Sequence, residues 1–188
     1  ILAVLMIFGS VSVAAFAWNT TTGAGFNLDI TTKIFREVNG EWVETEKVKK
    51  GENVKARVYL NTDYYTNSGQ LLFFYDSGFF TDSFGTGYET LTVNPYFTSS
   101  PYGINGKFIS SKSSSNIEDS LVNSGKITSE FANSHEFVFA TYSFSNTAKN
   151  QMLSSSNWFC EFPLTVKDDA SGTGDFFALE ETTASASF

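Results

Sequence analysis

Residues 53–62 read NVKARVYLNT, and the order of their side chains decides the class of fold. In an extended chain, four apolar side chains share one face, and two cations with a tyrosine share the other: Val54, Ala56, Val58 and Leu60, against Lys55, Arg57 and Tyr59. A period of two residues is typical of a β-strand with one buried face. The stretch therefore predicts a strand whose apolar side packs against a second layer.

Strand patterns continue on both sides of this stretch. Before it, FNLDITTKIFREV (26–38) is followed by Asn39-Gly40, a strong hairpin signal, and by EWVETEKV (41–48). After it, QLLFFYD (70–76) is almost wholly apolar, which indicates a strand buried on both faces. Together these segments predict a sheet of antiparallel strands.

The C-terminal half of the chain adds further strand patterns. We expect strands at 125–132, 136–144, 158–166 and 175–181, and Pro163 favours an edge or a bulge for the third of them. About eight or nine strands separated by turn signals, with no long helix, predict an all-β fold. The expected architecture is a jelly-roll-like antiparallel β-sandwich.

The region 77–125 differs in composition, because it is rich in Gly, Ser, Asn and Tyr. Short β-prone pieces stand at 88–93 and 106–110, and 117–122 fits a single helical turn. We interpret the region as long loops between strands, where binding residues usually lie.

The N-terminal residues 1–17, ILAVLMIFGSVSVAAFA, carry no charge and end in Ala-Phe-Ala. An apolar run before small residues is typical of a secretory signal peptide, and its missing basic start indicates that the sequence is clipped there. At 17 residues, interrupted by Gly9 and two serines, the stretch is short for a membrane span of about 20 residues. A membrane anchor and a pilin-like assembly helix are the alternatives.

These boundaries give the expected organisation of the chain. A signal peptide at 1–17 precedes a polar lead-in at 18–25, a β-sandwich at 26–181 and the start of a linker at 182–188. We therefore expect a secreted protein, extracellular or on the cell surface, with no stable membrane span in the mature chain.

The charge and the cysteine content exclude several classes of function. The net charge of −8 disfavours nucleic acid as a partner, because phosphate contacts need clustered lysine and arginine. The single cysteine, Cys160, rules out an intramolecular disulfide and a cysteine-based zinc site. It lies in an alternating apolar run, where a small buried residue is expected.

Three stretches share a strand-and-turn pattern: VKKGENVKARVYLNTDYY (48–65), SGQLLFFYDSGFF (68–80) and WFCEFPLTVKDDASGTGDFFALE (158–180). In this order along the chain, they resemble the cohesin and cohesin-like modules of bacterial extracellular surface proteins. The resemblance implies a jelly-roll sandwich that binds dockerin modules. Such a module attaches enzymes to scaffolds or proteins to cell surfaces.

The adjacent Asp168 and Asp169 stand between the last two strand patterns. An aspartate at the start of a turn accepts a hydrogen bond from its own backbone, and Gly172 and Gly174 allow a positive φ, so we interpret the segment as a turn. A calcium ion at the two carboxylates is the alternative, although calcium loops usually carry several spaced carboxylates. We expect no other cofactor.

Residues suited to catalysis are sparse. His135 is the only histidine, and the chain has no G-x-S-x-G motif. Glu130, Glu136 and Glu161 are candidates for a glycosidase pair, but in alternating strands they more simply mark a solvent face. We therefore expect no enzyme.

The sequence predicts a secreted, non-catalytic binding module for protein–protein recognition, with dockerin-like or other extracellular modules as partners. A sandwich face and the 77–125 loops supply the contacts in this interpretation, with five tyrosines as anchors: Tyr64, Tyr65, Tyr88, Tyr96 and Tyr102. One alternative is a carbohydrate-binding or adhesive module, in which these rings and three tryptophans bind polysaccharide: Trp18, Trp42 and Trp158. Another is a surface subunit that self-assembles by strand addition. Packing into the core is the competing interpretation for the aromatic residues.

Overall fold

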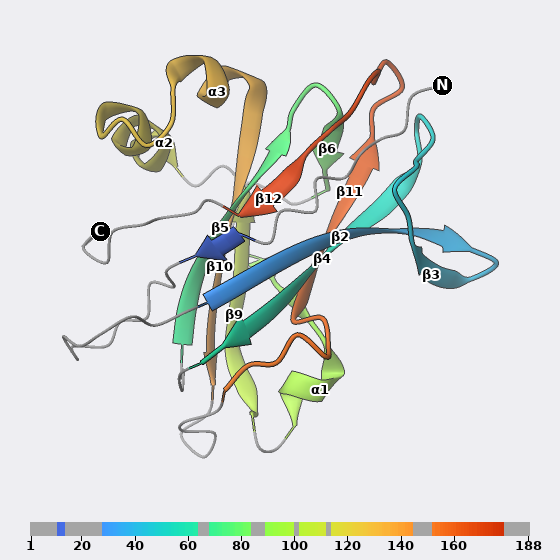
Figure 1. Cartoon of the computed structure of the whole chain (residues 1–188), viewed down its shortest axis with the longest axis vertical. Helices are drawn as coiled ribbons and strands as arrows, with labels where there is room; N and C mark the ends of the chain where they lie inside the picture. Colours follow the sequence, from blue (N-terminus) through green and yellow to red (C-terminus); the bar gives the residue numbers. More distant parts are fainter. Residues whose placement is uncertain are drawn as a thin grey trace.

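The computed structural model describes residues 11–13, 28–63, 68–83, 89–99, 102–111, 114–144 and 152–178. Within these residues the chain forms two sheets, and every strand pairing is antiparallel (Figure 1). The predicted all-β antiparallel fold is therefore confirmed. The described part holds twelve strands rather than eight or nine, because several are only two or three residues long.

The first sheet has seven strands. Five of them lie side by side in the order β1 (Val11–Val13), β2 (Leu28–Val38), β4 (Asn53–Thr62), β11 (Cys160–Val166) and β6 (Phe80–Asp82). The other two pair at the sides of this row: β3 (Glu41–Glu44) with β2, and β8 (Thr92–Val93) with β11. The long pairing of β2 with β4 forms the centre of this sheet.

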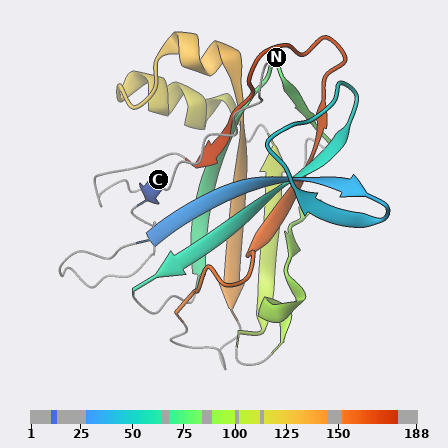
Figure 2. The ribbon, with the colours of Figure 1, turned by 45° about the vertical axis from the view of Figure 1, so that its right-hand side comes forward.

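The second sheet has five strands. Their order is β12 (Phe176–Ala178), β5 (Ser68–Asp76), β10 (His135–Phe144), β9 (Ile104–Ser111) and β7 (Glu89–Thr90). Figure 2 shows the two sheets as separate layers. One cluster of buried residues draws side chains from both layers, so the arrangement is a sandwich with its core between the sheets.

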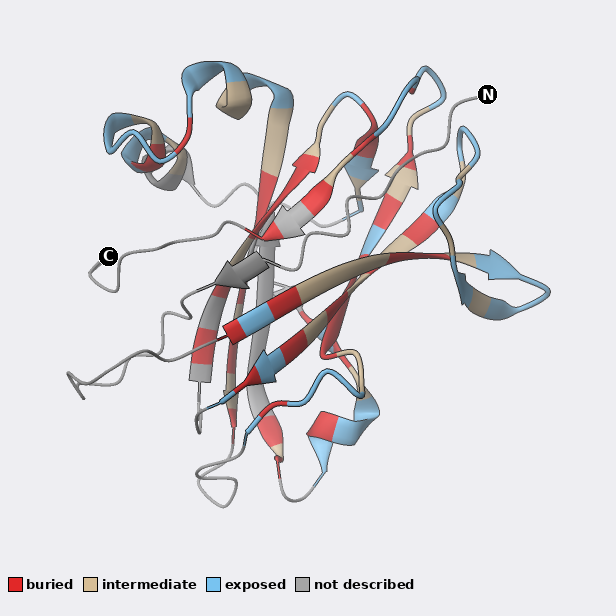
Figure 3. Ribbon diagram, viewed as in Figure 1, coloured by how far each residue is buried: buried red, intermediate tan, exposed pale blue. Residues whose placement is uncertain are grey.

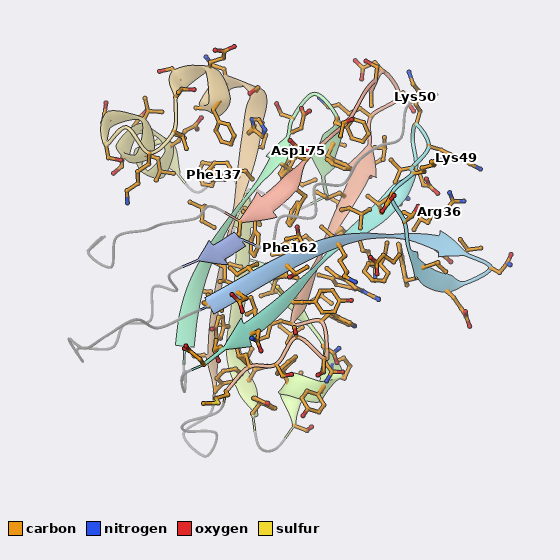
Figure 4. The ribbon with its side chains drawn as sticks, viewed as in Figure 1. Arg36, Lys49, Lys50, Phe137, Phe162 and Asp175 are labelled. Carbon is orange, nitrogen blue, oxygen red and sulfur yellow. The ribbon has the colours of Figure 1, made fainter. Side chains whose placement is uncertain are left out.

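The core follows the alternation read from residues 53–62. All four apolar side chains of that stretch are buried: Val54, Ala56, Val58 and Leu60. Across the interior, the ring of Phe73 lies 5.1 Å from that of Phe162 and 5.5 Å from that of Phe176. In Figure 4, Phe162 lies between the ribbons of the two sheets. Aromatic contacts between β5, β11 and β12 therefore join the layers.

A partly buried hydrogen bond also links the two sheets. Tyr75, on β5, donates its hydroxyl to Oδ2 of Asp82, on β6, at 2.7 Å. Burial, and after it this bond to Asp82, raise the pKa of the Tyr75 hydroxyl above its usual value of 10.0. The protonated hydroxyl thus favours the folded state.

Replacing Tyr75 with phenylalanine should lower the free energy of unfolding by about 1–2 kcal/mol at pH 7, because the bond to Asp82 is lost. Since the folded pKa is raised, the stability that this hydroxyl contributes is complete below pH 10 and is lost as the pH rises above it. Urea unfolding at pH 7 and at several pH values above 10 measures both effects. The interpretation is wrong if Y75F and the natural chain lose stability equally steeply above pH 10.

Two helices pack against one end of the outer face of the five-stranded sheet. They are α2 (Ser114–Asn123) and α3 (Ser129–Ser134), and their apolar residues meet the sheet in a second buried cluster: Phe74, Leu121, Ile127 and Phe137. Phe137 lies beside these helices in Figure 4. The prediction that residues 70–76 are buried on both faces is confirmed, because Phe73 belongs to the first cluster and Phe74 to the second.

Two expectations for the middle of the chain are wrong. Residues 125–132, expected as a strand, contain the start of α3, because the Thr128 side chain caps the helix by accepting a hydrogen bond from the Phe131 amide. The region 77–125 is not mainly long loops, since β6, β7, β8, α1 (Pro95–Thr98), β9 and α2 lie within it. The β-prone pieces at 88–93 and 106–110 and the helical turn at 117–122 are confirmed, because they fall in β7, β8, β9 and α2. These elements are short, and tertiary packing stabilises them more than their own propensities.

Pro163 lies in an inner strand, not at an edge or a bulge. On one side it pairs with Lys55 of β4. On the other side, β8 pairs with Cys160 and Glu161 of β11, and the pairing with β6 starts only at Leu164 of β11. Pro163 therefore faces the gap between two short neighbouring strands. A missing backbone N–H costs no ladder hydrogen bond there.

Strand β1 lies within the stretch predicted as a signal peptide and pairs with Leu28–Ile30 of β2. The signal peptide stays a prediction, and the lead-in at 18–25 and the linker at 182–188 lie outside the described residues. Among the helices that the structure describes, none has the length and apolar character needed to cross a membrane.

Candidate functional site

The outer face of the seven-stranded sheet gathers aromatic rings and cations. Register places Lys33 of β2 opposite Arg57 of β4, and Arg57 opposite Glu161 of β11. We call the whole set the ring-and-cation face: Lys33, Phe35, Trp42, Lys55, Arg57, Tyr59, Trp158 and Glu161. Its members come from β2, β3, β4, β11 and the segment before β11.

Each cation of this face lies over an aromatic ring. The Arg57 guanidinium is 4.4 Å from the centroid of the Phe35 ring and 4.9 Å from that of the Trp158 ring. Lys55 Nζ is 4.4 Å from the Trp42 ring centroid. Contacts of this kind stabilise by about 0.5–1 kcal/mol each at exposed sites, and they also hold the rings in fixed positions.

Lys33 joins the same network at its β3 side. Its Nζ lies 5.4 Å from the Tyr59 ring centroid and 2.9 Å from Oε2 of Glu44. Burial raises the pKa of the Tyr59 hydroxyl, while the charges of Lys33 and Arg57 act in the opposite direction. The Tyr59 ring is therefore partly buried beside two cations.

Glu161 holds the centre of the face. Its carboxylate accepts hydrogen bonds from Lys55 Nζ at 2.5 Å and from Arg57 Nε at 3.1 Å. The residue is only 6% exposed, so the expectation that it marks a solvent face is wrong. Register explains the difference, because Arg57 and Lys55 lie on the neighbouring strand and cover the carboxylate.

No described element packs over this face, whereas helices cover one end of the outer face of the other sheet. Helices α2 and α3 pack on the five-stranded sheet, and none of the described helices lies over β2 and β4 (Figures 1 and 2). The side chains of Lys33, Lys55 and Arg57 are between 16% and 31% exposed, so they lie flat on the sheet. The result is an open surface of fixed rings and paired charges.

Chemically, such a surface suits binding better than reaction. Aromatic residues and arginine are enriched in protein interfaces and dominate their binding energy. Each cation of the face has a carboxylate partner, although Lys55 and Arg57 share Glu161, so a partner that covers the face meets charges that are already hydrogen-bonded.

The structure does not bring the five predicted tyrosines together. Tyr64, Tyr65 and Tyr88 lie outside the described residues. Tyr102 is 7% exposed and packs against Phe97 and Phe144, so it belongs to the core. Tyr96 is 52% exposed on α1, at the end of the sandwich opposite α2 and α3 (Figure 1). Of the two that the structure describes, Tyr96 alone therefore offers its ring to a partner.

Asp168 and Asp169 lie in a turn after β11, closed by a hydrogen bond from the Ala170 amide to the Lys167 carbonyl. Both are exposed. Within the described ranges, no group of three or more His, Cys, Asp or Glu side chains is arranged to hold a metal ion. Calcium at these two carboxylates stays a prediction.

The residues considered for catalysis lie on different elements. Glu130 is on α3, Glu136 on β10 and Glu161 on β11, where Glu161 is held by two cations. His135 Nδ1 lies 2.9 Å from Ser134 Oγ, but that hydroxyl also donates to the Glu130 and Phe131 carbonyls at the end of α3. Cys160 is fully buried, and burial raises the pKa of its thiol.

Sequence reasoning named Trp42 and Trp158 as possible binding residues and Glu161 as a possible catalytic carboxylate, but it did not bring them together into one face. One signal was present, because Lys55, Arg57 and Tyr59 share the outward side of a single strand. The pairing of Glu161 with Arg57 could not be read from the sequence, since the two residues are 104 positions apart.

Comparisons with protein-family models, curated proteins and solved structures find no significant match to this chain. The resemblance to cohesins therefore stays a prediction.

Proposed function

We propose that the chain is a non-catalytic recognition module that binds a protein partner through the ring-and-cation face. In its specific form, the proposal is a cohesin-like module outside a bacterial cell with a dockerin-like partner. The observation that carries it is the concentration of Trp, Tyr, Phe and Arg side chains on the outer face of the seven-stranded sheet.

The energetics of the face support a protein partner. Phe35 is buried beneath Arg57, and Trp42 and Trp158 are half-buried, so their positions are set before binding. A partner then loses less side-chain entropy in ordering them. The charged groups are hydrogen-bonded to one another, which favours orientation and specificity.

Polysaccharide binding is the second candidate. Trp42 and Trp158 are partly exposed rings on the same flat face as the carboxylates of Glu44 and Glu161. Sugar rings stack on such platforms while their hydroxyl groups bind nearby polar side chains. The experiment below separates the two candidates.

Replacing Trp158 with alanine should weaken binding of a protein partner by about 30-fold, the effect of losing a central hot-spot ring. Biolayer interferometry of the full chain against a panel of purified dockerin modules, with calcium and then with a chelator, measures this. Met152→Ala is the matched control, because Met152 is exposed but lies outside the face. Affinity electrophoresis in polysaccharide gels and sedimentation at increasing concentration run in parallel.

The assignment of the face is contradicted if Tyr96→Ala abolishes binding and Trp158→Ala leaves it unchanged. Binding to polysaccharide alone, lost in W158A, moves the proposal to the sugar-binding candidate. A mass that rises with concentration, without either ligand, supports self-assembly instead.

A further inference from the structure

The hairpin of β2 and β3 extends past the body of the sandwich (Figures 1 and 3). Its turn is Asn39-Gly40, with φ of 55° and 84°, as two-residue hairpins of this type require. Among the described strands, β3 pairs only with β2. Its second edge is therefore a sheet edge.

The register shows which backbone groups face that edge. A two-residue turn makes Val38 and Glu41 a hydrogen-bonded pair, and the bond from the Thr45 amide to the Ile34 carbonyl continues the same alternation. Trp42 and Glu44 are the alternate residues, so their N–H and C=O groups point away from β2. No hydrogen bond from these backbone groups is seen to any other described element.

The side chains beside this edge differ on its two sides. Trp42 and Glu44 lie on the side of the ring-and-cation face, whereas Val43 lies on the opposite side with Val38. Val38 is 37% exposed and Val43 is 46% exposed, which is high for β-branched residues. Beyond β3, a shallow depression lined by Glu44, Thr45, Glu46 and Lys47 continues the line of the edge.

The exposed charges along the hairpin are mainly acidic. Four exposed carboxylates line it: Glu37, Glu41, Glu44 and Glu46. The cations of the neighbouring strands already have carboxylate partners, because Lys33 pairs with Glu44, Arg36 with Glu52 and Lys55 with Glu161. Charge complementarity at this edge therefore favours an occupant that brings positive charge.

We propose that the β3 edge binds an extended, basic segment of a partner protein by strand addition. The partner pairs its backbone with Trp42 and Glu44 and places lysine or arginine toward Trp42 and the carboxylates. Its alternate residues are apolar and pack on Val43. The recognised pattern is thus a cation at every second position, interleaved with Val, Ile or Leu.

This inference goes beyond the proposed function, because it depends on main-chain groups at one edge and not on the open face. The competing explanation is that the glutamates only keep the edge from pairing, as charged residues do in many sheets. The two explanations differ in whether a basic extended peptide binds.

The test uses a fluorescent peptide of about six residues in which lysine and valine alternate, titrated by anisotropy against the full chain. Glu44→Pro removes an outward N–H without removing a bond to β2, and proline is tolerated at such edges. We expect E44P to bind the peptide about tenfold more weakly, the effect of one lost hydrogen bond together with a blocked edge. Glu44→Thr keeps the N–H while removing the same carboxylate, so it isolates the loss of charge.

Far-UV circular dichroism will show whether E44P folds. If it does not, two N-methylated peptides test the proposal on the natural chain instead. In an added strand, every second peptide N–H points toward β3, so methylating that set should abolish binding, whereas methylating the other set should leave binding intact. Absence of binding by the alternating peptide overturns the proposal and supports edge protection. Equal binding by E44P and E44T, or equal loss in both methylated peptides, overturns strand addition as well.

Discussion

Replacing Glu161 with alanine should lower the free energy of unfolding by about 3–5 kcal/mol, the usual cost of removing one partner from a buried ion pair. Glu161 is 6% exposed and accepts hydrogen bonds from both Lys55 and Arg57. Without Glu161, the partly buried cations Lys55 and Arg57 lie side by side on one side of β4 with no carboxylate to pair with. Guanidinium unfolding followed by tryptophan fluorescence measures the change.

Glu161→Gln is the control for this prediction. Glutamine has nearly the same shape and keeps one acceptor oxygen, so it loses the charge but not the packing. We expect its loss of stability to lie between that of E161A and zero. If E161A costs less than about 1 kcal/mol, the ion pairs behave like exposed ones and the account of the face is wrong.

Phe73→Ala should also cost about 3–5 kcal/mol, as expected for truncating a fully buried phenylalanine. Phe73 has no exposed surface, and its ring contacts those of Phe162 and Phe176. These three residues come from β5, β11 and β12, so the cavity opens where the two sheets meet. Thermal and chemical unfolding of the same variant give the size of the loss.

Phe73→Leu provides the comparison, because leucine fills part of the volume and removes only the ring. The free energy of unfolding should fall clearly less in F73L than in F73A. Equal losses for the two variants would contradict the view that the cavity, and not the aromatic contact, sets the cost.

Local pattern was enough to predict much of the fold. The alternation of residues 53–62 assigned the buried and outward faces of β4 correctly, and Asn39-Gly40 located the hairpin. The almost wholly apolar run at 70–76 indicated burial on both faces, which α2 and α3 provide for one of them. In each case the signal lies in consecutive residues.

Other features depend on residues far apart in the sequence. Residues 125–132 have β-prone side chains, but Phe131 packs edge-on against Phe74 at 5.1 Å, and that contact favours a helix. Pro163 fits an inner strand only because β6 and β8 stop short of it. The burial of Glu161 depends likewise on its pairing with β4. These three features follow from strand order and register, and neither can be read from the alternation of side chains within one segment.

The two helices between β9 and β10 have a consequence for the topology of the domain. Strands β9 and β10 are antiparallel neighbours, paired from Val138 and Ser111 onward, and a short turn suffices to join such strands. The order of the strands therefore does not require α2 and α3. What the helices supply is cover for an apolar part of the sheet, since without them Phe74 and Phe137 would lose the packing of Leu121 and Ile127.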